Sequence, residues 1–409
     1  MSGTLPGGRS ALGLVIAGFV ISFVVVGGGI ETVGVFINGI SAATHWSRTS
    51  LSLGVGVGAV MAALSILPAG MLVDRFGVRV PMLAGVASLA VGFVILMLMQ
   101  QPSHFLFANF FLGPGFAACA LLPITIAVTI CIPERTTLAL GIVAAGSSVG
   151  TLVLAPALQA LIEATGWRHT YMVMGAAVVL TPLPFIAFTL PRGQLRKGGG
   201  HALELPASSS LLGELLQPGA GALAGVMVLP GLAAFSISVH LVPYLTGLGH
   251  SGAAAATALG ATVGISAIGK VGGGFAGERV GALTTLRLAL ALDAIAVALL
   301  RYAETPMALG AFVVLHGLAI GTQVAVVPAI AAAVLGTKRF GTLFGLLQLA
   351  TMLASAIGPV ASGLIFDRTG QYGGAILMWL GAFATATVLG FWIPGARAEA
   401  SVPPRAAGA

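Results

Sequence analysis

Charged residues are scarce in this sequence of 409 residues. Asp, Glu, Lys and Arg together make up 7% of the chain, whereas hydrophobic residues make up 57%. The mean hydropathy is +1.06. Soluble globular domains carry about 25% charged residues. The shortage of charge therefore excludes an ordinary soluble protein and predicts a chain that crosses a lipid bilayer repeatedly.

Cysteine is scarcer still. Cys119 and Cys131 are the two cysteines of the chain, and both fall in one expected helix, too far apart along it for a disulfide. The sequence has no Cys and His spacing typical of a metal site and no glycine-rich loop typical of an ATPase. We therefore expect no metal, no cofactor and no activity driven by nucleotide hydrolysis in this chain.

Long apolar runs fill most of the sequence, separated by short polar links. Each run is long enough for the roughly 20 helical residues that span a hydrocarbon core of about 30 Å. The first run follows MSGTLPGGRS, which has no cleavage site, and is expected to be a retained helix. The sequence predicts an all-α integral membrane protein with twelve transmembrane helices. The expected spans are 11–38, 50–73, 80–100, 103–131, 137–162, 169–190, 216–246, 253–277, 282–301, 306–335, 340–365 and 373–394.

Basic residues are distributed unevenly between the two sides of the expected bundle. Because loops on the cytoplasmic side are enriched in Lys and Arg, their distribution predicts that both termini are cytoplasmic, in the inner (plasma) membrane. The net charge of +7 then reflects topology and calls for no nucleic-acid partner. The cytoplasmic set is Arg9, Arg75, Arg79, Arg135, Arg192, Arg196, Lys197, Arg279, Arg287, Lys338, Arg339, Arg397 and Arg405, and the outer set is Arg48, Arg168, Arg301 and Arg368.

Two polar links resemble each other across the chain. GMLVDRFGVRV follows the second expected helix, and GGFAGERVG follows the eighth. Three positions of the first link recur 204 residues later in the second: Asp74 as Glu278, Arg75 as Arg279 and Gly77 as Gly281. The same offset relates Thr165 and Gly166 to Thr369 and Gly370. Such a duplication predicts two pseudo-symmetric six-helix halves. We place the N-terminal half at 1–190, a cytoplasmic linker at 191–215, the C-terminal half at 216–394 and a cytoplasmic tail at 395–409.

Acidic and Arg side chains beside a glycine turn can pair with each other and with nearby helix ends. We interpret the two repeated links as gate or scaffold motifs that hold neighbouring helices in one conformation. The alternative is that these are solvated loop charges placed by topology. The residues of this gate motif are Gly70, Asp74, Arg75, Gly77, Arg79, Glu278 and Arg279.

The repeated link GMLVDRFGVRV resembles the loop signature of the major facilitator superfamily, and the resemblance extends over residues 11–394. More specific strings resemble the monocarboxylate porter group, which includes the oxalate:formate exchanger type. They are HWSRTSLSL, RTTLALGIVAAGSSVG, ATGWRHTYMVMG, VHLVPYLTGLG, KRFGTLFGLLQL and GLIFDRTGQYGGA. The resemblance implies transport of a small organic anion, often with a proton. It also implies that helices 1, 4, 7 and 10 and parts of 2, 5, 8 and 11 line a central cavity.

Lys270 is the strongest candidate for a substrate contact. It is the only charged residue between Glu214 and Glu278 and lies deep in an apolar run, where a charge is costly and usually marks a substrate or ion path. The resemblance places it where porters carry an Arg that holds the substrate carboxylate. A Lys is a point charge without the bidentate fork of Arg, so the geometry of binding is expected to differ. The alternative is that Lys270 pairs with a neighbouring helix.

Glu31 is the candidate for proton coupling, because a carboxylate takes up a proton when isolated and is ionised beside a cation. It could instead belong to a gate ion pair. From the rise per residue we expect roughly 8 Å of height between Glu31 and Lys270.

Further polar residues are expected on cavity-lining helices. His240 and His316 titrate near physiological pH and are candidates for contact with the substrate, and His240 is also a candidate for carrying the coupled proton. His240 and Tyr244, four residues apart, are expected to face the cavity and the substrate from one side. Each His could equally be a hydrogen-bonded packing residue. Asp293, on a helix expected to face lipid, is expected to bond to a neighbour or to lie at an interface rather than to contact substrate. Neutral hydrogen bonds to the substrate are expected from Asn109, Ser147, Ser148, Gln323 and Gln348.

These residues predict a secondary transporter, not an enzyme, that moves a small monocarboxylate, lactate-like or aromatic, with a proton by alternating access. We expect it to function as a monomer. One alternative is an organic anion or dicarboxylate exchanger. A dicarboxylate site would be expected to contain two cations in the cavity, whereas Lys270 is the only Lys or Arg that the sequence places on a cavity-lining helix. Another is a proton-driven drug efflux pump, against which Lys270 also argues. A third is a receptor or scaffold that keeps the fold without transport.

Overall fold

The structure is a computed structural model that describes residues 4–5, 9–119, 121–132, 136–190, 218–335 and 340–394. The expected linker at 191–215 and the expected tail at 395–409 lie outside these residues, and so does the side chain of Asp74.

Twelve helical segments in the described part of the chain are long and apolar enough to cross a membrane, which confirms the predicted number. They extend beyond several of the predicted boundaries, and the first runs from Ala11 to Thr44. The first six segments are α1 (Ala11–Ile21) with η1 (Ser22–Gly28) and α2 (Val33–Thr44), α3 (Arg48–Phe76), α4 (Arg79–Leu98), α5 (Pro102–Cys119) with α6 (Leu121–Cys131), α7 (Thr136–Thr165), and α8 (Trp167–Leu180) with α9 (Pro182–Phe188). The other six are α11 (Pro218–Gly247), α12 (Gly252–Val280), α13 (Ala282–Leu299) with η3 (Leu300–Tyr302), α14 (Pro306–Leu335), α15 (Phe340–Thr369) and α16 (Gly373–Gly390).

A small antiparallel hairpin precedes the first helix. It pairs β1 (Thr4–Leu5) with β2 (Arg9–Ser10). The rest of the described chain consists of helices and the short turns that connect them.

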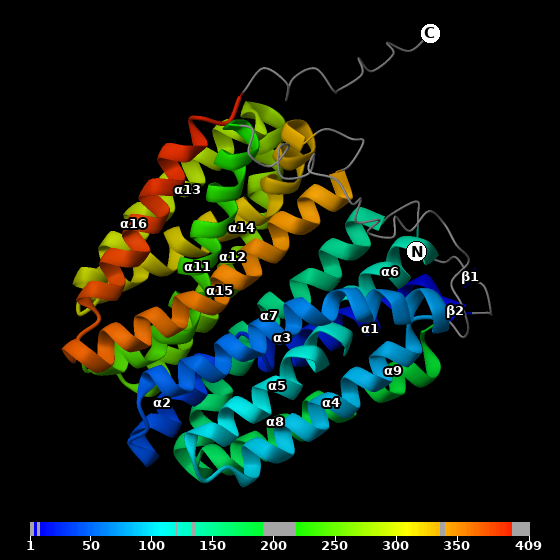
Figure 1. Cartoon of the computed structure of the whole chain (residues 1–409), viewed down its shortest axis with the longest axis horizontal. Coiled ribbons are helices and arrows are strands. Elements are labelled where there is room, and N and C mark those ends of the chain that lie inside the picture. The colour runs from blue at the N-terminus through cyan, green and yellow to red at the C-terminus, as the bar shows by residue number, and fades with distance from the viewer. Residues whose placement is uncertain are drawn as a thin grey trace.

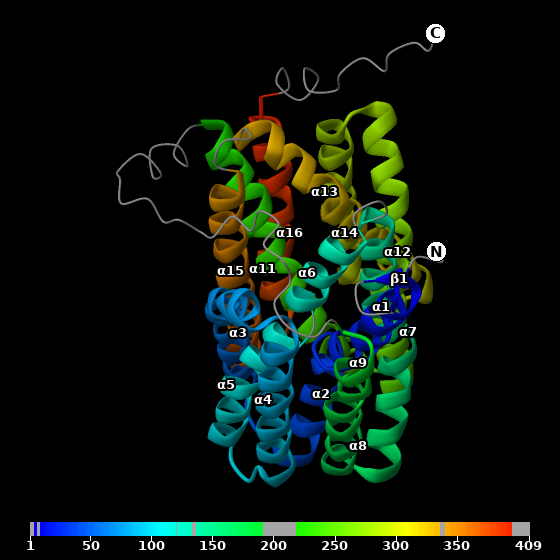
Figure 2. The same ribbon diagram turned by 90° about the vertical axis from the view of Figure 1, so that its right-hand side faces the viewer.

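The helices fall into two groups that lie against each other (Figures 1 and 2). Helices α1 to α9 share one hydrophobic cluster, to which Val239 of α11 is added. Helices α11 to α16 build two further clusters, to which the first group adds the buried residues Val35 and Ala155 and the partly buried Ile162. Apolar side chains thus pack mainly within residues 11–190 and within residues 218–394.

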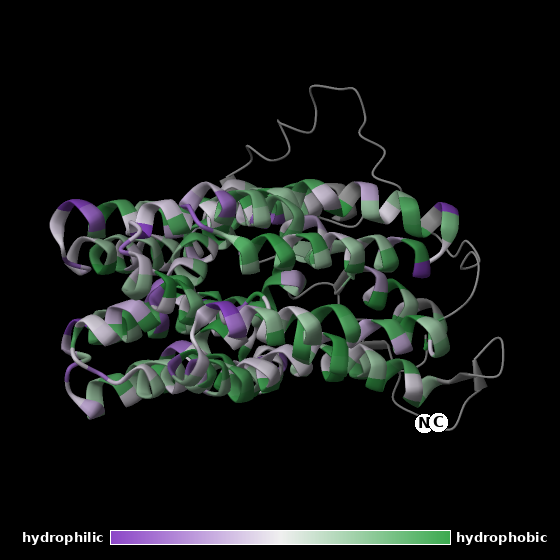
Figure 3. Cartoon of the chain, turned by 90° about the horizontal axis from the view of Figure 1, so that it is seen from below, coloured by the Kyte–Doolittle hydropathy of each residue, from purple (hydrophilic) through white to green (hydrophobic). Residues whose placement is uncertain are grey.

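The outer surface of the helices is apolar along its length, and hydrophilic residues gather at helix ends (Figure 3). Large apolar side chains point outward, among them Phe188, Val271 and Met307, which is 86% exposed. In water such exposure would be unfavourable, whereas hydrocarbon accepts it. The surface therefore suits a lipid bilayer.

Helices α3 and α12, which correspond in the internal repeat, begin and end with equivalent residues. Ser47 caps the start of α3 by accepting a hydrogen bond from the backbone of Ser50, and Ser251, at the offset of 204, caps α12 in the same way. Gly77 and Gly281 follow the ends of these helices with φ of 78° and 90°, a region that favours glycine. We name the two ends of the bundle after the basic residues found there. The Arg48 end carries the turns near residues 45–47, 166, 248–251 and 370–372, and the Arg79 end carries the turns near 77–78 and 281.

Two helix pairs approach closely at glycines. A Cβ at Gly150 of α7 would collide with the carbonyl of Phe23 in η1. A Cβ at Gly321 of α14 would collide with the carbonyl of Ser266 and would lie 2.8 Å from the backbone nitrogen of Lys270 on α12. Small residues permit such backbone contact between membrane helices. The second contact fixes the depth of Lys270 relative to α14.

Candidate functional site

A cavity of about 280 Å³ lies between the two helix groups at mid-depth. Its wall is formed by the first span together with α7, α11, α12 and α14. Most of the wall is apolar, with Phe235, Leu241 and Leu259 among its members. The polar side chains in this wall are those of Glu31, Ser147, Ser148, Ser238, Thr262, Ser266, Lys270 and His316.

Lys270 is half-buried and reaches across the cavity toward the opposite group of helices. Its Nζ atom donates a hydrogen bond of 3.2 Å to Ser148 Oγ on α7. Ser148 Oγ in turn lies 3.5 Å from Ser266 Oγ on α12. An ammonium group has three donors, and Ser148 takes one, so the remaining donors can serve an anion in the cavity.

Glu31 lines the same cavity and is held by an irregular segment of the first span. The π-helical segment η1 is followed by a turn, and the backbone N–H of Glu31 donates to the carbonyl of Val26, five residues earlier, at 3.1 Å. Irregular backbone at membrane depth is tolerated where it lines a cavity. Glu31 and Lys270 attract each other electrostatically. The structure therefore brings together the two charged residues that the sequence singled out.

The break in the first span leaves backbone carbonyls without their usual helical partners. The hydroxyl of Thr151 on α7 donates to the carbonyl of Gly27 at 3.3 Å, and the hydroxyl of Thr32 donates to that of Gly28. These bonds offset the cost of unpaired carbonyls at this depth. The sequence analysis missed the break, although three consecutive glycines at 27–29 could have indicated it.

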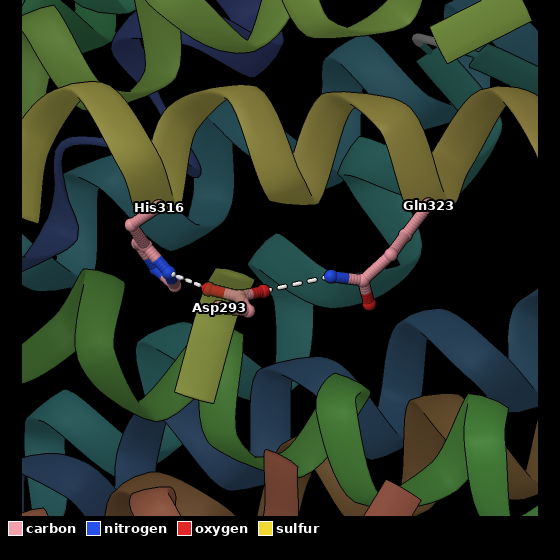
Figure 4. A network of polar contacts seen from close by, with 3 residues as sticks. All are labelled: Asp293, His316 and Gln323. Carbon is pink, nitrogen blue, oxygen red and sulfur yellow. Dashed lines mark hydrogen bonds and ion pairs between the residues drawn. The ribbon is translucent and has the colours of Figure 1, made fainter. Parts of the chain in front are cut away.

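His316 and Gln323 lie on one face of α14 and both contact Asp293 of α13 (Figure 4). Asp293 is fully buried. His316 Nδ1 donates to one carboxylate oxygen, and Gln323 Nε2 donates to the other at 2.7 Å. The prediction that Asp293 bonds to a neighbour is confirmed. His316 lines the Lys270 cavity, and its carboxylate partner was not foreseen as part of the site.

A second cavity, of about 340 Å³, adjoins the first. The two share Gly231, Ala234, Ile320 and Val324 in their walls. Gln323 and Gln348 line the second cavity and not the first, and its other walls include Pro328 and Phe344. Because these residues lie further toward the Arg79 end, the two cavities form one path from Lys270 in that direction.

His240 and Tyr244 lie away from this path. His240 is fully buried, with Nε2 at 2.8 Å from the carbonyl of Pro359 and 3.2 Å from Ser52 Oγ, and Nδ1 at 3.0 Å from the Tyr372 hydroxyl. The Tyr244 hydroxyl donates to the carbonyl of Leu300 at 2.5 Å. The expectation that both face the cavity is therefore corrected, since both rings pack on Tyr372 instead.

Asn109 and Ser147 are placed differently from each other. Asn109 lines a separate cavity of about 100 Å³ inside the first helix group, and its amide donates to the carbonyl of Phe105 at 2.9 Å. Ser147 lines the Lys270 cavity, and its hydroxyl donates to the carbonyl of Ala144 at 3.0 Å. Of these two residues, only Ser147 is thus within reach of an anion held by Lys270.

At the Arg48 end, the two helix groups are joined by Asp367. Its carboxylate accepts hydrogen bonds from the backbone N–H groups of Arg48, at 3.1 Å, and Thr49, at 2.8 Å. The guanidinium of Arg48 donates to the Tyr372 hydroxyl and lies 3.8 Å from the ring centroid of Phe366. Burial raises the pKa of Tyr372 to about 12, so its hydroxyl stays neutral beside Arg48.

Glu163 takes the corresponding place in the other repeat. The offset of 204 relates Glu163 to Asp367 and Arg48 to Gly252. A Cβ built on Gly252, the first residue of α12, would lie 2.7 Å from Glu163 Oε1. Each carboxylate therefore stands at the start of a helix in the opposite group, where the helix dipole favours negative charge. The relation between Glu163 and Asp367 was not predicted, although the same offset of 204 that relates the glycine turns also relates these two residues.

The gate-motif residues at the Arg79 end have mixed surroundings. Arg79 donates to the carbonyls of Leu190, at 2.7 Å, and Ala187, at 3.0 Å, and so caps the end of the sixth span. Arg75, Glu278 and Arg279 are exposed. The guanidinium of Arg75 lies 5.1 Å from the Phe76 ring centroid and that of Arg279 lies 4.1 Å from the Phe275 ring centroid, whereas a Cβ at Gly70 would meet open space.

The sequence and the fold both match known proteins. Residues 19–300 match the Major Facilitator Superfamily. Monocarboxylate transporter 12-B of Danio rerio is 27% identical over 342 residues, which cover 75% of this chain and 71% of that protein. A bacterial homologue of the human lysosomal transporter Spinster, solved in an inward-facing and occupied conformation, has a TM-score of 0.69, 17% identity and coverage of 94% of this chain and 95% of its own. The nucleoside transporter NupG has a TM-score of 0.71, 14% identity and coverage of 93% and 98%.

Proposed function

This chain belongs to the Major Facilitator Superfamily, whose members are transporters and not enzymes, and we propose that it carries a small monocarboxylate together with a proton. The predicted superfamily and the predicted twelve-helix fold are confirmed. The substrate class and the proton are the proposed part. The observation that carries the proposal is Lys270 in the cavity between the helix groups, with Glu31 in the same wall.

Lys270 is the proposed anchor of the substrate carboxylate. Its Nζ atom keeps donors that Ser148 does not use, and the hydroxyls of Ser147 and Ser266 stand in the same wall. The apolar side chains of Phe235 and Leu241 would receive the alkyl or aromatic part of the acid. The distant relatives named monocarboxylate transporters support this substrate class.

Glu31 is the proposed carrier of the coupled proton. In the empty cavity its carboxylate is attracted to Lys270. A substrate carboxylate that binds Lys270 brings a second negative charge to the same cation, and two carboxylates at one cation repel each other. Protonation of Glu31 removes the conflict. Anion and proton would therefore bind together, which is the requirement for symport.

Alternating access is the proposed way of moving both ligands. Asp367 and the bond of 3.1 Å from Thr246 to Asn38 hold the halves together at the Arg48 end, where Glu163 lies close to the start of α12, while the two adjoining cavities extend toward the Arg79 end. We propose that the Arg79 end is cytoplasmic, with both termini, because the links that the sequence predicts on that side hold most of the basic residues of the sequence. The arrangement is then that of a carrier open to the inside.

Uptake of labelled acids into proteoliposomes, with and without an inward proton gradient, tests the proposal. We expect a gradient to accelerate uptake of lactate-like or aromatic acids, and Lys270→Met to lower uptake about tenfold or more, since a hydrogen bond to a charged group contributes about 1.5–3 kcal/mol. Lys270→Arg keeps the charge and is expected to retain uptake with altered acid preference. Arg301→Met is the matched control, because it removes an exposed cation at the Arg48 end.

Four outcomes would contradict the proposal. Wild-type uptake by Lys270→Met would refute the carboxylate anchor. Accumulation against a gradient by Glu31→Gln would place the proton elsewhere. If a dicarboxylate loaded inside the proteoliposomes accelerates uptake of a dicarboxylate from outside, the exchanger is favoured. If the protein transports a lipophilic cation and no acid, the efflux pump is favoured.

A further inference from the structure

Asp293 is an ionisable residue that is buried within a membrane-spanning helix. It is fully buried on α13, where a carboxylate is expensive unless it is hydrogen-bonded and its charge is balanced. Both of its oxygens are occupied, one by His316 and the other by Gln323. His316 is the basic side chain that faces this carboxylate. The dyad of Asp293 and His316 is therefore a built polar unit within an apolar environment.

The dyad fixes the orientation of the imidazole ring of His316. A carboxylate that accepts from Nδ1 leaves Nε2 as the nitrogen that points elsewhere. The ring is stacked on Phe312, at a centroid distance of 4.9 Å, and meets the edge of Phe383 at 6.1 Å. Nε2 has no hydrogen-bond partner within the part of the chain that the structure describes, and His316 is in the wall of the Lys270 cavity. The wall of the cavity thus contains an imidazole that is held by Asp293 through Nδ1 and whose other nitrogen is not engaged by the described residues.

The position of His316 relative to Lys270 follows from the packing of α12 and α14. Both helices run from the Arg48 end toward the Arg79 end, and Gly321 lies against the backbone of Lys270. His316 lies about one and a half turns before Gly321, or about 7.5 Å nearer the Arg48 end. An extended lysine side chain with a small acid bound to it can span this distance along the helix axis. One molecule could then contact both residues.

We propose that Nε2 of His316 binds a hydroxyl oxygen on the transported acid, so that the preferred substrate is a hydroxylated monocarboxylate. This inference rests on the proposed function, in which Lys270 holds the carboxylate. A hydroxyl suits this place because it donates to a neutral imidazole and accepts from a protonated one. Asp293 acts as a positioning residue, which keeps Nε2 directed at the cavity. An acid without the hydroxyl leaves Nε2 unpaired, and such a site discriminates against it.

Competitive uptake of matched acids tests the inference. Lactate is compared with propionate, and 3-hydroxybutyrate with butyrate, in proteoliposomes that contain wild type, His316→Leu or His316→Gln. We expect wild type to have a lower KM for the hydroxylated member of at least one pair. His316→Leu should raise that KM about tenfold more than it raises the KM for the unsubstituted acid, because only the hydroxylated acid loses a hydrogen bond. His316→Gln keeps a polar group and should restore part of the preference.

The outcomes separate this inference from the proposed function. If wild type takes up none of the acids, the proposed function fails. If it takes them up but His316→Leu leaves the ratio of the two KM values unchanged, only the contact with His316 is refuted. An equal loss of uptake for both members of a pair in His316→Leu and in His316→Gln would assign His316 a packing role and overturn the inference as well.

Discussion

Asp367, near the end of α15, accepts a hydrogen bond of 3.1 Å from the backbone N–H of Arg48 at the start of α3, in the opposite half of the molecule. The neighbouring N–H of Thr49 donates to the other carboxylate oxygen. A charged acceptor at a helix start gains from the charge-assisted bonds and from the helix dipole. Glu163, at the corresponding position of the repeat, lies close to the start of α12 and accepts a hydrogen bond from Gln159 of its own helix.

Removal of the charge on Asp367 should loosen the contact between the halves at the Arg48 end. In Asp367→Asn the side chain keeps its shape but loses the charge-assisted bonds, which contribute about 1.5–3 kcal/mol each. We expect a cysteine placed at Ser238, in the cavity wall, to react about tenfold faster with an impermeant maleimide added at the Arg48 side. The background carries Cys119 and Cys131 replaced by alanine.

Two further variants make this test specific. Glu163→Gln should act in the same direction, and the double variant should react faster than either single one. Glu304→Gln removes an exposed carboxylate at the same end and should leave the rate unchanged. Equal rates in Asp367→Asn and wild type would show that the carboxylate does not hold the end closed.

Close packing of α12 on α14 depends on Gly321. In Gly321→Ala the new methyl group would collide with the carbonyl of Ser266, and overpacking of this kind costs about 1–3 kcal/mol. We expect a lower Tm in detergent, together with slower uptake because Lys270 is displaced. Gly310→Ala, in the same helix but with open space around its Cβ, should leave both unchanged. A Tm for Gly321→Ala as high as that of Gly310→Ala would contradict the packing argument.

The effect of substituting Arg79 tells whether the repeated link acts as a scaffold or as a gate. Its guanidinium caps the carbonyls of Leu190 and Ala187, and Arg287 caps those of Gly390 and Ile393 in the other half. We expect Arg79→Gln to lower the Tm by several degrees, as Arg287→Gln also should, with the KM for substrate unchanged. If Arg79→Gln instead alters KM and leaves the Tm intact, Arg79 takes part in gating.

The fold was largely predictable because its signals are local. Twelve apolar runs of membrane-spanning length and a polar link repeated at a constant offset needed no knowledge of tertiary contacts. The glycines of the repeat, such as Gly77 and Gly281, sit at positive φ, a backbone conformation that the residue type itself suggests. Asp293 was foreseen to need a partner because a buried carboxylate always does.

The site was predictable only in part, because it depends on which face of each helix turns inward. Lys270 and Glu31 stood out by charge alone, and the structure places both in one cavity wall. His240 looked like a cavity residue, yet Pro359 and Tyr372 surround it, and both lie more than a hundred residues away in sequence. Single-residue patterns carry no information about such contacts between distant helices.

The opposite charges of Lys270 and Glu31 also have an electrical consequence. A single elementary charge moved through a potential of 100 mV exchanges about 2.3 kcal/mol with the field. The two charges cancel when the cavity is empty, and a bound anion with its proton adds none. Neither the loaded nor the empty carrier would then do work against the membrane voltage, and the proton gradient alone, through its pH component, would drive accumulation.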